Sequence, residues 1–201
     1  MLVLIMAGGR GTRLAMGEKP LVTICGRPMI SYVIDAFDSA DCEVVVVTSP
    51  KTPYTRNWCR VQGITEYPAQ GAGYVEDLVE AAQTLEASGP LFTSVSDLPC
   101  LTPQIITEIH RRYEESGKPA CSTWIPKSLC QEYDCRTAYT EEVQDTLSCP
   151  AGINIFLSEG IDGPEEEEKL LIRDPRLAFN INTREERARV EKYLCRERRG
   201  E

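Results

Sequence analysis

Three glycines and two basic residues near the N-terminus form the cluster best suited to chemistry, within MLVLIMAGGRGTRLAMGEKPL. They are Gly8, Gly9, Gly11, Arg13 and Lys19. Glycines permit a tight backbone path whose N–H groups point to one centre, which suits phosphate oxygens. Arg13 and Lys19 add positive charge, and Lys19 can neutralise charge that develops on a phosphoryl group. The spacing differs from GxxxxGK[ST] and from GxGxxG. The alternative is that the glycines only turn the chain between a strand and a helix.

Carboxylate and amide side chains further along the chain suit a divalent cation. Asp97 directly follows the apolar run LFTSVS, and Mg²⁺ usually combines one or two carboxylates with triphosphate oxygens. An N-cap or Asx-turn role before LPCLTP is the alternative for Asp97. In FNINT, Asn180 and Asn182 are two positions apart, so on a strand they share one face. Thr183 can cap the helix that follows.

Short apolar runs alternate with helix-period segments, which predicts an α/β fold. The expected strands are Leu2–Ala7, Glu43–Thr48, Gly63–Tyr67, Leu91–Ser96, Ala120–Ile125, Gly152–Leu157 and Leu177–Ile181. The expected helices are Pro28–Ser39, Tyr74–Ala87, Thr102–Ser116 and the charged segment 183–201. Continuous β-branched runs such as EVVVVTS are typical of strands covered on both faces. We therefore expect a three-layer open α/β sandwich with a mainly parallel, Rossmann-like sheet, which binds ligands beyond the carboxyl ends of its strands.

The length of 201 residues suits a single domain. The polar segment 126–149 is expected to be an excursion or lid on that domain. The acidic run Glu165–Glu168 follows Pro164 and is expected to form the first turn of a helix.

Composition excludes several classes of protein. The net charge of −9 argues against a nucleic-acid-binding surface. No stretch approaches the roughly 18 apolar residues of a membrane span, and no basic segment precedes the first apolar run, so we expect a cytoplasmic protein. The nine cysteines form no CxxC pair and only one histidine is present, so zinc is poorly supported. Cys130 and Cys135 are the thiols most open to pairing, and His110 has no expected catalytic role.

The N-terminal motif LIMAGGRGTRL…EKPL resembles the signature of the nucleotidyltransferase superfamily, which includes sugar-phosphate nucleotidylyltransferases and molybdenum-cofactor guanylyltransferases. The resemblance implies that the loop wraps a nucleoside triphosphate, with catalytic roles for Lys19, Arg13 and Asp97. It implies a Mg²⁺ site at Asp97 and Asn182, with Asn180 structural. The implied loop contacts to the nucleotide are Ala7, Gly8, Gly9, Gly11, Thr12, Arg13 and Lys19. Residues 14–16 depart from the pattern of relatives.

Two further motifs, GAGYVEDL at 71–78 and PAGIN at 150–154, narrow the resemblance. Together with AGGRGTR…EKPL, TSPKTP and FNINT, they look like the GTP:adenosylcobinamide-phosphate guanylyltransferase family of cobalamin assembly. The match runs in order from residue 2 to about 183 and fails mainly within 126–149. It implies the nucleotide-diphospho-sugar transferase type of fold, Mg²⁺ as cofactor, GTP and adenosylcobinamide phosphate as substrates, and a possible homodimer.

Guanine offers an N1–H and an amino group as donors, so its binding site must present acceptors. Glu76, Asp77 or backbone carbonyls around Gly71–Gly73 can serve, although both acids also suit the first turn of a helix. The remaining candidates for nucleotide contacts are Thr48, Ser49, Gly73 and Asp77. Gly152 and Asn154 are the candidates for substrate contacts, although Gly152 can instead ease the start of a strand.

Three alternatives remain open from the sequence. The acceptor can be molybdopterin or a sugar 1-phosphate instead. A non-catalytic GTP-binding module on the same fold is the alternative from another class, and Asp97 together with Asn182 speaks against it because binding alone needs no second metal ligand.

Overall fold

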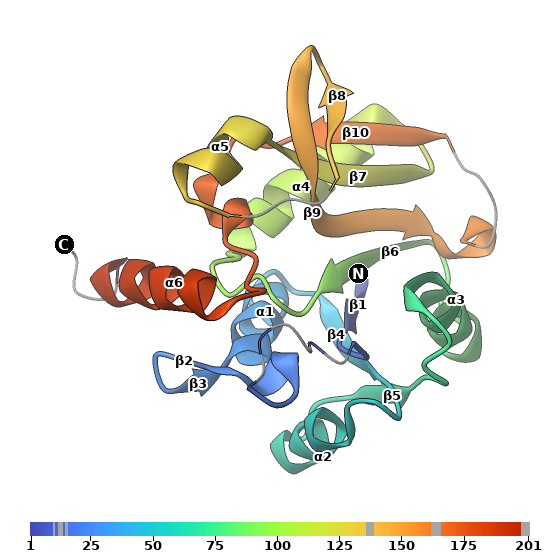
Figure 1. Cartoon of the computed structure of the whole chain (residues 1–201). Helices are drawn as coiled ribbons and strands as arrows, with labels where there is room; N and C mark the ends of the chain where they lie inside the picture. The colour runs from blue at the N-terminus through green and yellow to red at the C-terminus, as the bar shows by residue number, and fades with distance from the viewer. Residues whose placement is uncertain (10, 12–13, 15, 136–138, 162–165, 198–201) are drawn as a thin grey trace.

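The computed structural model describes residues 1–9, 11, 14, 16–135, 139–161 and 166–197. Its centre is an eight-stranded sheet with the order β10-β7-β9-β6-β1-β4-β5, to which β8 adds by pairing with β9 (Figure 1). The strands are β1 (Leu2–Met6), β4 (Glu43–Thr48), β5 (Glu66–Pro68), β6 (Pro90–Val95), β7 (Ala120–Pro126), β8 (Glu141–Val143), β9 (Thr146–Leu157) and β10 (Glu167–Leu171). A separate hairpin joins β2 (Thr23–Ile24) to β3 (Arg27–Pro28).

The sheet is mainly parallel, as expected. Along the strand order, β9 runs antiparallel to both β6 and β7, whereas the other pairings are parallel. The β-branched run of β4 is buried along most of its length, because helices cover both faces of a parallel sheet.

Helices lie on both faces of the sheet and make the expected three layers. Val3 and Ile5 of β1 share a buried cluster with α1 (Met29–Asp38), α2 (Pro53–Gln62), α4 (Pro103–Ser116) and α5 (Lys127–Glu132). Leu4 points the other way and packs with Leu78 and Ala81 of α3 (Tyr74–Thr84). This alternation follows from the period of two in a strand. Within the described residues, no helix is long and apolar enough to cross a membrane.

Several elements differ from the sequence expectation. The segment Leu177–Ile181 is not a strand, because Asp174 caps the 3-10 helix η3 (Pro175–Ala178). The run at Glu165–Glu168 opens no helix in its described part, where β10 begins at Glu167. Helix α2 was not expected, and α5 and β8 lie inside the segment 126–149.

The strand order reverses at β1. The chain passes from β1 through α1 to β4 and β5 on one side of β1, and returns through α3 to β6 on the other side. The loops that follow β1 and β6 therefore diverge, which opens a crevice at the carboxyl ends of these strands. The glycine loop and Asp97 follow β1 and β6, so the topology brings them to the same crevice.

Candidate functional site

A cavity of about 630 Å³ lies at this switch point. Eight of the residues predicted to bind nucleotide or metal line it: Gly8, Gly9, Gly11, Lys19, Gly73, Asp77, Asp97 and Asn182. They come from four separate stretches of the chain. The predicted Thr12 and Arg13 lie outside the described residues.

Gly11 lets the glycine loop pack against the stem of Lys19. Its φ is +57°, in the left-handed region, and a Cβ at this position would lie 2.4 Å from Lys19 Cβ. Glycine is therefore required here both by backbone conformation and by space. The contact holds the loop and the lysine at fixed positions relative to each other.

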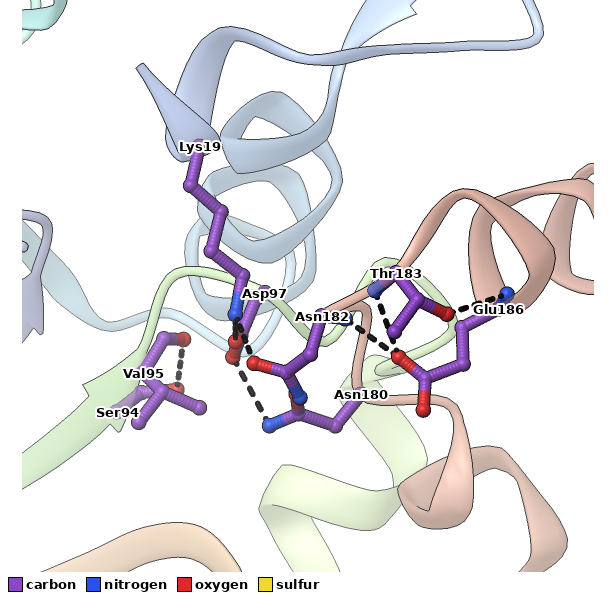
Figure 2. Close-up of polar contacts among 8 residues, drawn as sticks. All are labelled: Lys19, Ser94, Val95, Asp97, Asn180, Asn182, Thr183 and Glu186. Carbon is purple, nitrogen blue, oxygen red and sulfur yellow. Dashed lines mark hydrogen bonds and ion pairs between the residues drawn. The ribbon is translucent and has the colours of Figure 1, made fainter. Parts of the chain in front are cut away.

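Lys19 connects the two predicted metal ligands (Figure 2). Its ammonium group pairs with Asp97 Oδ2 and donates a hydrogen bond of 2.8 Å to Asn182 Oδ1. Asn180 Nδ2 donates to Asp97 Oδ1 at 3.2 Å, and Asn182 Nδ2 donates to Asn180 Oδ1 at 2.6 Å. Asp97 is 7% exposed, so this network orients a carboxylate that is largely withdrawn from water.

The start of α6 (Arg184–Glu197) positions Asn182. The Glu186 carboxylate accepts from the backbone N–H groups of Asn182 and Thr183, at 2.7 and 2.9 Å, while Glu186 N donates to Thr183 Oγ1 at 3.2 Å (Figure 2). This reciprocal pair is a capping box, with Thr183 as the N-cap residue that the sequence predicted. It fixes the backbone immediately beside the amide that contacts Lys19.

Glu18 anchors the other end of the glycine loop, a role that sequence analysis missed. Its carboxylate accepts from Tyr54 N at 2.8 Å, and from Thr55 N and Thr55 Oγ1 at 2.6 Å each. These groups lie in the first turn of α2, where unpaired N–H groups and the helix dipole favour a carboxylate. Since Glu18 directly precedes Lys19 in the chain, these hydrogen bonds also fix the backbone from which the Lys19 side chain extends.

Asp77 and Lys51 shape the loop at residues 71–73. Asp77 Oδ1 accepts from Gly71 N and Ala72 N at 2.9 Å each, and Lys51 Nζ donates to Gly71 O at 2.6 Å. The second oxygen, Asp77 Oδ2, faces Gly8 across the cavity wall, 3.6 Å from where a Gly8 Cβ would lie. Lys51 lines the cavity and was not predicted from the sequence. The signal for it was its position in TSPKTP, after the carboxyl end of β4.

Three predicted nucleotide contacts lie behind the cavity wall. Ala7, Thr48 and Ser49 are at most 3% exposed and are absent from the cavity lining. Thr48 Oγ1 donates to Glu66 Oε2 at 3.1 Å, and Ser49 Oγ donates to Gly8 O at 2.7 Å. Ser49 therefore supports the glycine loop, and Thr48 connects β4 to β5.

The predicted substrate contacts Gly152 and Asn154 do not line the cavity themselves; they contact residues that do, or residues that bond to them. Gly152 has a φ of +79°, and a Cβ on it would lie 2.8 Å from Cγ2 of Val95, which lines the cavity. Asn154 Nδ2 donates to the buried Thr93 Oγ1 at 3.4 Å. Thr93 in turn hydrogen-bonds Tyr74, another lining residue that the sequence did not single out.

The Tyr74 side chain is buried at its hydroxyl end and exposed over the rest. The residue is 44% exposed, but its hydroxyl end reaches the fully buried Thr93. Burial of that end, with the negative charge of Asp97 nearby, raises the pKa of Tyr74, although the Thr93 hydrogen bond opposes the shift. The hydroxyl thus stays protonated at neutral pH, and Tyr74 is both a lining residue of the cavity and partly exposed to solvent.

Comparisons with known proteins find relatives along most of the chain. The family model described as the MobA-like NTP transferase domain matches residues 3–148. The chain is 32% identical to an adenosylcobinamide-phosphate guanylyltransferase of Methanocaldococcus jannaschii, over 95% of this chain and 96% of the relative. It is 30% identical to a probable molybdenum cofactor guanylyltransferase of Thermococcus kodakarensis, over 92% of each.

Solved structures show the same fold. A hypothetical transferase from Thermus thermophilus superposes with a TM-score of 0.71 at 15% identity, covering 92% of this chain and 98% of that one. A CMP:2-keto-3-deoxy-manno-octonic acid synthetase complexed with CTP gives 0.69 at 15% identity, covering 98% of each chain. The expected nucleotide-diphospho-sugar transferase type of fold is thus confirmed.

Proposed function

Because the chain belongs to the MobA-like NTP transferase family, we propose that it transfers GMP from GTP to the phosphate of adenosylcobinamide phosphate. The products are adenosylcobinamide-GDP and pyrophosphate. The observation that carries the proposal is the convergence of Lys19, Asp97 and Asn182 beside the glycine loop. The choice of acceptor rests on likeness to the Methanocaldococcus relative along nearly the whole chain.

The donor set fits the Mg²⁺ that the family implies. Asp97 Oδ2 and Asn182 Oδ1 are oxygen ligands of the kind Mg²⁺ prefers, and the Lys19 ammonium already lies between them. The space between Asp97 Oδ2 and Asn182 Oδ1 thus favours a positive charge. The described residues hold no group of three or more His, Cys, Asp or Glu that could bind a metal ion, so phosphate oxygens of the substrate are left to complete the coordination. When bound, the cation would neutralise charge on those phosphates.

The reaction needs positioning and charge neutralisation more than proton transfer. An oxygen of the acceptor's phosphate attacks the α-phosphorus of GTP, the bond to the β-phosphate oxygen breaks, and pyrophosphate leaves. The attacking phosphate is ionised at neutral pH, so a general base is unnecessary. Lys19 and the N–H groups of the glycine loop stabilise the charge on the equatorial oxygens and the leaving group.

Asp77 is the best placed side chain to select guanine. Its Oδ1 holds the loop at Gly71 and Ala72, which leaves Oδ2 to accept from guanine N1–H and the amino group. Glu76 is less suitable, because its carboxylate folds back over Gly73: a Cβ there would lie 2.1 Å from Glu76 Oε2. Asp77 is 6% exposed, and a buried acceptor left unpaired by adenine would be costly.

The acceptor would enter on the side of the cavity formed by β6 and α3. Tyr74, Val95 and Ser96 line this side, with Gly152 and Asn154 supporting two of them from β9. The Tyr74 ring supplies an exposed apolar face at the mouth of the cavity, which suits the edge of a large macrocycle. The corrinoid would thus remain mostly outside the protein.

The decisive experiment offers one donor to several acceptors. The chain is incubated with Mg²⁺, GTP and adenosylcobinamide phosphate, molybdopterin or a sugar 1-phosphate, while pyrophosphate release and product mass are followed. We expect turnover with the corrinoid and at least about tenfold slower turnover with ATP or CTP. Turnover confined to another acceptor would replace the proposed substrate, and GTP binding without turnover on any acceptor would favour a binding module. Asp97→Asn serves as the inactive control.

A further inference from the structure

Two cysteines that are distant in sequence lie against each other at the protein surface. Cys25 Sγ and Cys195 Sγ are 2.7 Å apart, although 170 positions separate them. Cys25 lies in the turn between β2 and β3, and Cys195 lies on α6. A disulfide bond is about 2.05 Å long, so the two sulfurs need to approach by only about 0.7 Å.

The contact between the hairpin and α6 holds the two thiols together. Arg187 Nε donates to Thr23 O at 2.9 Å, and Cys25 N donates to Glu191 Oε1 at 3.2 Å. Arg187 also pairs with Glu191 at 2.9 Å. Positions 187, 191 and 195 are spaced by four, so they lie on one face of the helix. These polar contacts, together with the packing of Ile24 in one hydrophobic cluster with Val190 and Leu194 of α6, hold the helix on the hairpin and keep the two thiols in register before any covalent bond forms.

The Cys25–Cys195 pair, of which Cys195 is exposed and Cys25 partly exposed, differs from the cysteines of the core. Cys130 Sγ lies 3.3 Å from Cys149 Sγ in the core, and the mutual hydrogen bond together with burial raises the pKa of Cys130. Cys135, which the sequence suggested as its partner, instead donates to Tyr133 O at 3.5 Å. Burial likewise raises the pKa of Cys121 to about 12. Cys121, Cys130 and Cys149 are buried, so these thiols stay protonated and away from solvent, whereas Cys195 is exposed.

We propose that Cys25 and Cys195 form a reversible disulfide when the protein meets a low-molecular-weight disulfide. The Cys195 thiolate attacks one sulfur of that disulfide, which releases one thiol and leaves a mixed disulfide on Cys195. The Cys25 thiolate then attacks the Cys195 sulfur, the protein disulfide forms, and the second thiol leaves. The two protein thiols lose two electrons and two protons, and the oxidant is reduced to two thiols.

The bond would join the two sides of the candidate site. The hairpin follows Lys19 by a few residues, and α6 begins at Arg184, just beyond Asn182 and its N-cap Thr183, and carries Glu186, which accepts from the backbone N–H of Asn182. The covalent link therefore fixes the segments that supply Lys19 and Asn182. It also closes a loop of 170 positions, and a long loop restricts the unfolded chain strongly.

The test uses thiol trapping of the whole chain and does not depend on any activity. The protein is equilibrated with oxidised or reduced glutathione, alkylated, digested and analysed by mass spectrometry. We expect a Cys25–Cys195 peptide after oxidation only, and a Tm higher by about 5–15 °C. Cys195→Ser should lose both effects, and Cys130→Ser should keep both. The proposal is overturned if both thiols are alkylated after oxidation, or if the linked peptide joins other cysteines.

Discussion

Lys19 and Asn182 are 163 positions apart in the chain, and Lys19 Nζ donates a hydrogen bond of 2.8 Å to Asn182 Oδ1. The same ammonium group pairs with Asp97. It therefore occupies the space between the oxygens of the two proposed metal ligands. On the proposed function, we expect binding of nucleotide and cation to draw the ammonium group away from these oxygens and toward the phosphates.

Replacing Lys19 should separate its proposed role in catalysis from its competition with the cation for Asp97 and Asn182. In Lys19→Met, kcat/KM should fall at least about 100-fold, because one charged group on a phosphoryl transition state is worth about 3 kcal/mol. The affinity of the protein alone for Mn²⁺, followed by electron paramagnetic resonance, should rise because the competing ammonium is gone. Lys192→Met, at an exposed position on α6, is the control. Unchanged activity in Lys19→Met would remove the lysine from the mechanism.

Asn182 should set the metal requirement. Asn182→Ala removes Oδ1, so the Mg²⁺ concentration that gives half-maximal activity should rise about tenfold or more. Asn182→Asp keeps an oxygen at this position and should restore much of the affinity. Titration of activity with Mg²⁺ at saturating GTP measures the effect. A half-maximal concentration that is the same in all three proteins would exclude Asn182 as a ligand.

The positions of Gly8 and Asp97 in the fold could be predicted because two rules suffice for them. Short apolar runs in the sequence locate β1 and β6. Because these strands are parallel, their carboxyl ends lie at the same edge of the sheet. The resemblance of FNINT to a family motif supplied Asn182. The capping role of Thr183 also followed from local sequence alone, since a capping box depends on residues three apart.

Other features depend on tertiary contacts and escaped prediction. The segment Leu177–Ile181 looks like a strand because Phe179 and Ile181 are apolar and buried, yet they pack with α6 and not in a sheet. Glu18 binds groups 36 and 37 positions later, which no local pattern reveals. Helix α2 was predictable in retrospect, because Thr52 and Pro53 repeat the start signal of Thr102 and Pro103 and Gly63 ends the helix with a φ of +70°.

Glu18 should affect both stability and catalysis. Glu18→Ala leaves the first N–H groups of α2 and the buried Thr55 hydroxyl without their acceptor, so the free energy of unfolding should fall by about 1–2 kcal/mol. Since Lys19 follows directly, kcat should also fall while KM for GTP changes less. Glu18→Gln keeps an acceptor oxygen but not the charge, and should lie between the two. Urea unfolding and steady-state kinetics measure the two effects, and an equal free energy of unfolding in wild type, Glu18→Ala and Glu18→Gln would contradict the capping role.

Gly11 and Gly17 offer a matched test of the loop. Both have a positive φ, +57° and +84°, but a Cβ on Gly17 meets no atom within 4 Å, whereas one on Gly11 meets Lys19 Cβ. Each alanine variant should lose about 1 kcal/mol of stability from backbone strain. Gly11→Ala alone should also displace Lys19 and lower kcat/KM by about 10–100-fold. Equal activities of the two variants would show that the contact with Lys19 does not matter.

Gly152 should act on the acceptor through Val95. In Gly152→Ala, the new Cβ would lie 2.8 Å from Val95 Cγ2 at a φ of +79°, so the strand pair β6–β9 must separate or Val95 must shift into the cavity. We expect KM for the acceptor to rise about tenfold or more, with KM for GTP less affected, because Val95 lines the side of the cavity proposed for the acceptor. The double variant Gly152→Ala with Val95→Ala removes the colliding methyl groups and keeps the backbone strain. It should therefore recover the acceptor KM but not the lost stability, and a coupling energy near zero between the two changes would place the effect of Gly152 elsewhere.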